Sequence, residues 1–138
     1  MTASNPDPRA LERWIIWLDA VVFGGIGLAF LFWPQELAGF LGIELTNTTA
    51  LNDFRAVYGG VPAGLAAFLF LAVSRPSWTV PALWMALLTL TGLAVGRVLS
   101  EALDGTPEFI VQALQVAEIA GALLCALGLI RIARRRRR

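Results

Sequence analysis

Residues 109–130 read FIVQALQVAEIAGALLCALGLI. A helix needs roughly 17–25 mostly apolar residues to cross a bilayer, and this stretch meets that requirement. Its polar residues, with the glutamate just before it, are Glu108, Gln112, Gln115 and Glu118. Steps of four, three and three residues place these side chains on one stripe of a helix. The stretch therefore predicts a membrane-spanning helix with one polar face.

Glu118 is the deepest member of that stripe. At about 1.5 Å of rise per residue it lies roughly 15 Å along the helix. Ionisable groups at such depth face the interior of a bundle or a wet cavity, because lipid solvates them poorly. We expect no basic residue at its depth, and we therefore expect Glu118 to be protonated or held by hydrogen bonds.

The rest of the chain predicts three more helices that enclose this stripe. The chain has 138 residues, of which 57% are hydrophobic and 15% charged, and its mean hydropathy is +0.69. Residues 14–33, 51–73 and 78–99 form the other membrane-length apolar stretches. We predict an all-α, integral membrane four-helix bundle, one domain over residues 1–138, with a basic tail at 131–138. Pro34–Phe40 is predicted to be a short interfacial helix after the first span, and Thr48 or Thr49 to cap the second.

The distribution of charge predicts the orientation of the bundle. Every basic residue is an arginine, and the arginines outside the spans lie before the first span, between the second and third, and after the fourth. The two other connections carry acidic residues and no basic residue. We predict that the protein lies in the inner (plasma) membrane. The positive-inside rule then places both termini in the cytoplasm. A basic run that adjoins a span indicates a topology signal in contact with membrane lipid, not a nucleic-acid site.

Several kinds of chemistry are excluded by composition. The chain has no histidine and one cysteine, Cys125. This argues against zinc, haem and iron–sulfur sites, and against catalysis by Ser-His-Asp or Cys-His groups. We predict no metal and no cofactor. Cys125 lies in an apolar run and is expected to be a packing residue.

Two groups of polar residues make up the candidate site. Arg55 and Tyr58 share a helical face with Pro62, which has no N–H for the carbonyl of Tyr58 and should leave that carbonyl facing a pocket. Arg97 lies at the outer end of the third span. The predicted ligand-binding set at the mouth of the pocket is Arg55, Tyr58, Arg97, Glu108, Gln112 and Gln115, with Glu118 and Asp19 at its base.

These residues also permit structural roles. The outer charges can form an ion-pair network that fixes the register of the helices. Asp19 can be a hydrogen-bond partner of a neighbouring helix, or it can reach the inner surface. The sequence leaves these alternatives open.

Four short elements resemble a known family. They are Arg55-Ala56-Val57-Tyr58-Gly59-Gly60, then Gly96-Arg97, then Asp104-Gly105-Thr106-Pro107, and then Glu118. This pattern resembles a family of small bacterial four-helix membrane proteins catalogued as a domain of unknown function. The resemblance covers about residues 14–130 and leaves out the basic tail. It implies four transmembrane helices and marks these residues as the polar set of the family, without an established activity.

Three functions fit these residues. The first is binding or transport of a small anionic or amphiphilic lipid-like ligand, because arginine suits carboxylate and phosphate groups; transport by so small a unit would require a homo-oligomer. The second is an acid–base enzyme (an isomerase, a cyclase or an epoxide-opening enzyme) in which Glu118 and Asp19 act on an apolar lipid or prenyl substrate. The third is a structural or regulatory membrane subunit. The sequence does not decide whether the chain is an enzyme.

Overall fold

The computed structural model describes residues 9–138 as an all-helical chain. The elements are α1 (Ala10–Phe32), α2 (Pro34–Phe40), α3 (Thr48–Phe54), the π-helical turn η1 (Arg55–Gly60), α4 (Val61–Val73), the 3₁₀ turn η2 (Pro76–Trp78), α5 (Thr79–Asp104) and α6 (Phe109–Arg136). Four helical segments are long and apolar enough to cross a membrane: Ala10–Phe32, Thr48–Val73, Pro76–Asp104 and Phe109–Arg136. The predicted fold class and the predicted short helix after the first span are confirmed.

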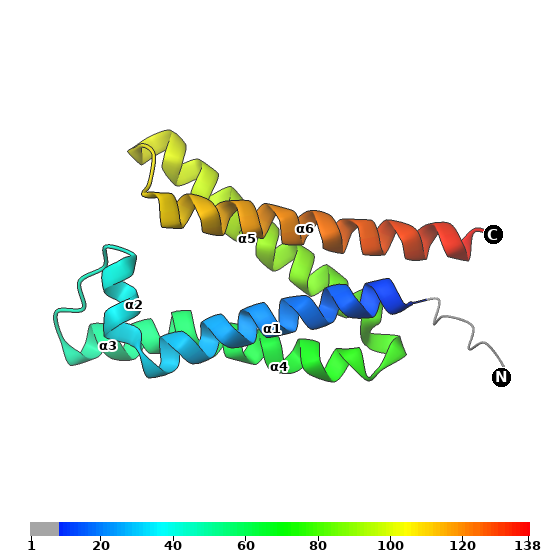
Figure 1. The fold of residues 1–138 in the computed structure, drawn as a ribbon, viewed down its shortest axis with the longest axis horizontal. Helices are drawn as coiled ribbons and strands as arrows, with labels where there is room; N and C mark the ends of the chain where they lie inside the picture. Colours follow the sequence, from blue (N-terminus) through cyan, green and yellow to red (C-terminus); the bar gives the residue numbers. More distant parts are fainter. Residues whose placement is uncertain (1–8) are drawn as a thin grey trace, which may run out of the picture.

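The helices form two antiparallel pairs, α1 with α4 and α5 with α6 (Figure 1). Glycine brings the first pair close together. A Cβ atom on Gly27 of α1 would lie 2.6 Å from the backbone nitrogen of Ala63 and 2.9 Å from the carbonyl oxygen of Gly59. A Cβ on Gly59 would in turn lie 2.8 Å from the side chain of Leu31. Small residues permit such backbone contact between membrane helices, where dispersion forces and not hydrophobic exclusion hold helices together.

The second spanning segment is not one regular α-helix. In η1 the N–H of Val61 donates to the carbonyl of Ala56, five residues earlier. The next residue, Pro62, has no N–H to continue either pattern. A π-helical turn therefore replaces the regular helix that the sequence suggested around Tyr58.

The ends of the elements differ from the sequence-based expectations in three places. Asn47 caps α3, and its side-chain oxygen accepts from the N–H of Ala50 at 2.9 Å, so the expected threonine cap is wrong. Helix α5 continues past residue 99 to Asp104, where Gly105 with a φ of 100° ends it. Helix α6 continues through most of the predicted basic tail, to Arg136.

The hydrophobic core lies in the half of the bundle nearer the start of α1 and the end of α6. Its fully buried side chains include Ile16 of α1, Leu69 of α4, Leu83 of α5 and Cys125 of α6. Toward the opposite end, the α5–α6 pair diverges from the α1–α4 pair (Figure 1).

Candidate functional site

The centre of the candidate site is an ion pair between α5 and α6. Nε of Arg97 donates to both carboxylate oxygens of Glu118, at 3.0 and 2.8 Å. The side chains are 28% and 11% exposed. The expectation that Glu118 has no basic residue at its depth is therefore wrong.

The length of α5 explains this correction. Because α5 ends at Asp104, Arg97 lies about 10 Å inside the end of its helix, instead of near the end as the sequence suggested. Glu118 lies about 15 Å along from Glu108, so the two Cα atoms differ by only about 5 Å in depth. The long arginine side chain spans that difference.

The two terminal nitrogens of Arg97 form no hydrogen bond with any residue from 9 to 138. Arg97 belongs to a membrane-length segment, Pro76–Asp104. Donors of a charged group at this depth require partners, because lipid tails accept no hydrogen bond. These donors are thus available to a ligand, a lipid headgroup or water.

A second polar contact joins α1 to α6. The thiol of Cys125 donates to Oδ2 of Asp19 at 3.2 Å, and both residues are buried. The other oxygen of Asp19 lies 3.8 Å from the position that a Cβ on Gly121 would occupy. Gly121 follows Glu118 by about one turn on the same side of α6. Glu118 therefore lies on the side of α6 that faces Asp19 of α1, and the two carboxylates are not on opposite sides of the bundle.

Arg55 and Tyr58 lie in η1, where their contacts are with α1 and α3. Nε of Arg55 donates to the carbonyl of Leu31 in α1 at 3.2 Å. The ring of Tyr58 stacks on Phe54 with centroids 4.5 Å apart, and it lies 5.7 Å from Phe30. These contacts hold η1 against α1 and do not involve Arg97 or Glu118.

The remaining predicted ligand-binding residues lie on the first turns of α6. Glu108 is exposed at the N-cap position of α6. The side-chain amide of Gln112 donates to the carbonyl of Pro107 at 2.8 Å, which ties the start of the helix to the preceding turn. Gln115 is half-buried, about one turn from Glu118.

Sequence reasoning missed Glu12. Its side chain is fully buried near the start of α1, and neither carboxylate oxygen has a hydrogen-bond partner among the described residues. Nε of Arg131 lies 3.6 Å from its Oε1, and a terminal nitrogen of Arg135 lies 3.8 Å from the same atom. Glu12 precedes Asp19 by seven residues, so the two share a helical face, and that spacing could have identified it.

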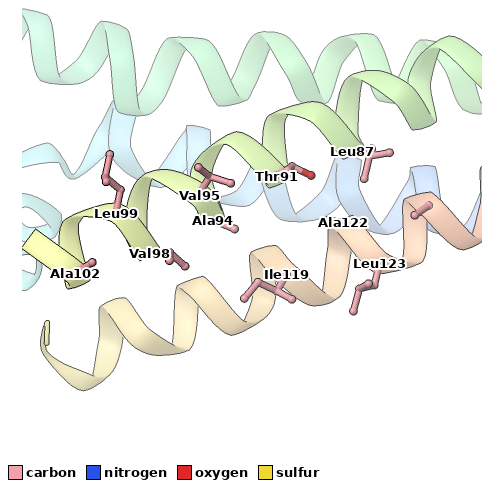
Figure 2. Close-up of a pocket in the computed structure, with 11 residues that line it drawn as sticks. Leu87, Thr91, Ala94, Val95, Val98, Leu99, Ala102, Ile119, Ala122 and Leu123 are labelled. Atoms are coloured by element: carbon pink, nitrogen blue, oxygen red, sulfur yellow. The ribbon is translucent and has the colours of Figure 1, made fainter.

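The structure also contains an apolar groove on the α5–α6 pair (Figure 2). It has a volume of about 590 Å³ and is lined by Leu87, Thr91, Ala94, Val95, Val98, Leu99, Ala102, Ile119, Ala122, Leu123 and Ala126. A second cavity, of about 430 Å³, lies at Gln35 and residues 43–46 between α2 and α3. Neither cavity is lined by Arg55, Arg97 or Glu118. Within residues 9–138, no group of His, Cys, Asp or Glu side chains is arranged to hold a metal ion.

Four apolar helices with charged and polar groups between them define this chain as a small helical membrane protein. The family model of DUF4345, a domain of unknown function, matches residues 11–129. The chain belongs to this family, which confirms the resemblance seen in the sequence. Comparisons with curated proteins and with solved structures found no match.

Proposed function

We propose that the chain binds a small anionic or amphiphilic lipid-like ligand at the end of the bundle where the α5–α6 pair diverges from the α1–α4 pair. We call this end the open end. The observation that supports this most directly is the state of Arg97. One of its nitrogens is held by Glu118, while the terminal nitrogens have no partner among the described residues. Arginine presents such donors as a planar fork that matches a carboxylate, sulfonate or phosphate group.

The divergence of the two helical pairs leaves apolar side chains of α1 exposed at about the level of Arg97, because Asp19 and Leu90 lie beside Gly121, and Ile26 and Arg97 each follow by seven residues. On α1, Val22 and Ile26 lie one and two turns beyond Asp19, on the face that Asp19 turns toward α6. They are 48% and 36% exposed, so α1 is not covered by α6 there. An alkyl chain from the surrounding lipid can lie against these residues while its polar head binds Arg97.

The orientation that goes with this function has the open end at the outer surface. Nine arginines lie at the end with the start of α1 and the end of α6, whereas the connections at the open end, residues 33–47 and 105–108, carry Glu36, Glu44 and Glu108 and no arginine. By the positive-inside rule the termini are then cytoplasmic, in the inner (plasma) membrane. The ligand enters from outside or laterally from the outer leaflet.

Binding of decanesulfonate to the protein in lipid nanodiscs tests the proposal. The Arg97→Gln/Glu118→Gln variant removes the fork without leaving an unpaired charge, and its affinity should fall by about tenfold or more, as expected for lost hydrogen bonds to a charged group. Arg75→Gln is the matched control. Arg75 lies over the ring of Trp78 at the opposite end of the bundle, 4.6 Å from the ring centroid. Equal affinity in all three proteins would contradict the proposal.

A second candidate is an acid–base enzyme, because Asp19 of α1 faces the side of α6 that carries Glu118. Incubation of the protein with a membrane lipid extract, followed by mass spectrometry, would detect an isomerised, cyclised or epoxide-opened product. Such a product should disappear in both Asp19→Asn and Glu118→Gln. A product that persists in both variants would exclude this mechanism, and the absence of any ligand or product would favour a structural or regulatory subunit.

A further inference from the structure

The end of the bundle that holds both termini carries an extreme concentration of positive charge. The side chain of Arg9 donates to the carbonyl of Pro76 at 3.1 Å, so the start of α1 and the α4–α5 turn lie together. The ribbon shows the end of α6 on the same side (Figure 1). At this end, residues 9–13, 74–78 and 131–138 include nine arginines and a single side-chain carboxylate, Glu12. The arginines are Arg9, Arg13, Arg75, Arg131, Arg134, Arg135, Arg136, Arg137 and Arg138.

Glu12 divides the arginines of α6 into two sets. Arg131 and Arg135 are four residues apart and lie at 3.6 and 3.8 Å from the buried carboxylate. They are directed toward α1 and join the ends of the two helices. Arg134, Arg136, Arg137 and Arg138 are exposed, and their side chains have no ion pair with any residue from 9 to 138. We call these four the arginine collar.

The collar has no counter-charge among residues 9–138. Like charges three and four residues apart destabilise a helix, yet α6 continues to Arg136. The partial negative charge at the C-terminus of the helix offsets only about half an elementary charge. Because α6 leaves the bilayer directly into this segment, the nearest available anions are the headgroups of the adjoining leaflet.

We infer that the arginine collar binds the headgroups of anionic phospholipids in that leaflet, and that Glu12 limits this binding by holding Arg131 and Arg135 against α1. Clusters of four to eight basic residues next to a membrane helix are suited to anionic lipid, since each residue near the surface contributes about 1 kcal/mol of attraction. This inference does not depend on the ligand proposed for Arg97.

Electron paramagnetic resonance of spin-labelled lipids tests the inference with the full chain in phosphatidylcholine bilayers. The fraction of motionally restricted label is compared for phosphatidylglycerol and phosphatidylcholine, which gives the selectivity for the anionic headgroup. Wild type should prefer phosphatidylglycerol, and high salt should weaken that preference. Changing all four collar arginines to glutamine should lower the selectivity by about threefold or more.

Two further variants separate charge from folding and identify the role of Glu12. Changing the four arginines to lysine preserves the charge and should preserve most of the selectivity. Glu12→Gln removes the carboxylate that lies beside Arg131 and Arg135 and should raise the selectivity above that of wild type. Each variant is checked by circular dichroism for unchanged helix content.

Three results would overturn the inference. They are equal restriction of the two lipids by wild type, retention of full selectivity by the glutamine variant, and equal loss in the lysine and glutamine variants. Tight binding of a fluorescent single-stranded oligonucleotide to the protein in purely phosphatidylcholine nanodiscs, lost in the glutamine variant, would assign the collar to nucleic acid instead.

Discussion

At the scale of single residues, the net charge of the candidate site is set by the ion pair of Arg97 and Glu118. The guanidinium and the carboxylate form a pair with no net charge inside a membrane-length bundle. An anion that binds to the terminal nitrogens of Arg97 would leave one negative charge without compensation. In a medium of low dielectric constant that excess is strongly unfavourable. The other acidic and thiol groups on the α1 side of α6, Asp19 and Cys125, supply no positive charge.

We therefore expect Glu118 to compete with a bound anion for Arg97, so that the carboxylate limits the affinity of the site. Isothermal titration calorimetry with decanesulfonate measures that affinity.

Glu118→Gln should bind decanesulfonate more tightly than wild type, because Arg97 then has no competing carboxylate. Glu101→Gln is the matched control, since Glu101 follows Arg97 by one turn of α5 and is not its partner in the ion pair. An unchanged affinity in Glu118→Gln would refute this competition and leave ligand binding itself intact.

Asp19 tests a different residue-scale contact, the one to Cys125. Asp19→Asn preserves the size of the side chain and can still accept from the thiol, so we expect a small change in unfolding temperature. Asp19→Leu leaves the thiol without an acceptor and inserts a branched side chain next to Leu90 and Gly121, and it should destabilise the protein by about 1–3 kcal/mol. Thermal unfolding in detergent compares the two, and equal stability would show that the hydrogen bond is not important for folding.

At the scale of elements, close helix contact in the α1–α4 pair depends on Gly27. A methyl group there would meet backbone atoms of Ala63 and Gly59 that cannot rotate away. We expect Gly27→Ala to destabilise the protein by about 1–3 kcal/mol, as overpacking does in other tightly packed interiors. Retention of wild-type stability would mean that α1 and α4 can separate freely.

Gly25 provides the control on the same helix. A Cβ on Gly25 has nothing within 4 Å, so Gly25→Ala should be neutral or should stabilise the helix by up to about 1 kcal/mol through helix propensity. The difference between the two alanine variants, measured by thermal unfolding in the same detergent, isolates the contact from the propensity.

The sequence predicts the elements well and the contacts between them poorly. Membrane-length apolar stretches and Pro34 define α1, α2 and the other spans, because length and polarity are local properties. The ion pair of Arg97 was missed because the extra turns of α5 before Gly105 decide the depth of Arg97. The burial of Glu12 was missed because it depends on α6 remaining helical among its arginines. Neither property is visible within a single span.

At the scale of the whole molecule, the structure has one strongly positive end and one acidic end. The orientation can be measured with single cysteines, because Cys125 is fully buried and should not react with a polar reagent. Ser77 lies in η2 near the start of α1, and Thr106 lies in the α5–α6 connection at the opposite end. The two variants are Ser77→Cys and Thr106→Cys.

With a membrane-impermeant maleimide added to intact cells, Thr106→Cys should be labelled and Ser77→Cys should be labelled only after the membrane is opened. Wild type is the control for reaction at Cys125. The reverse pattern would place the termini outside and would invert the direction from which a ligand enters.

The divergence of the two helical pairs also has a mechanical consequence. A bundle that is well packed at one end and spread at the other is wedge-shaped along its length. We expect lateral pressure in the leaflet around the spread end to press the pairs together, so that the shape of the protein should respond to bilayer tension and curvature. Fluorescence energy transfer between dyes at Thr46→Cys and Thr106→Cys, in vesicles of decreasing diameter, would follow that closure, and a distance independent of curvature would show that the wedge is rigid.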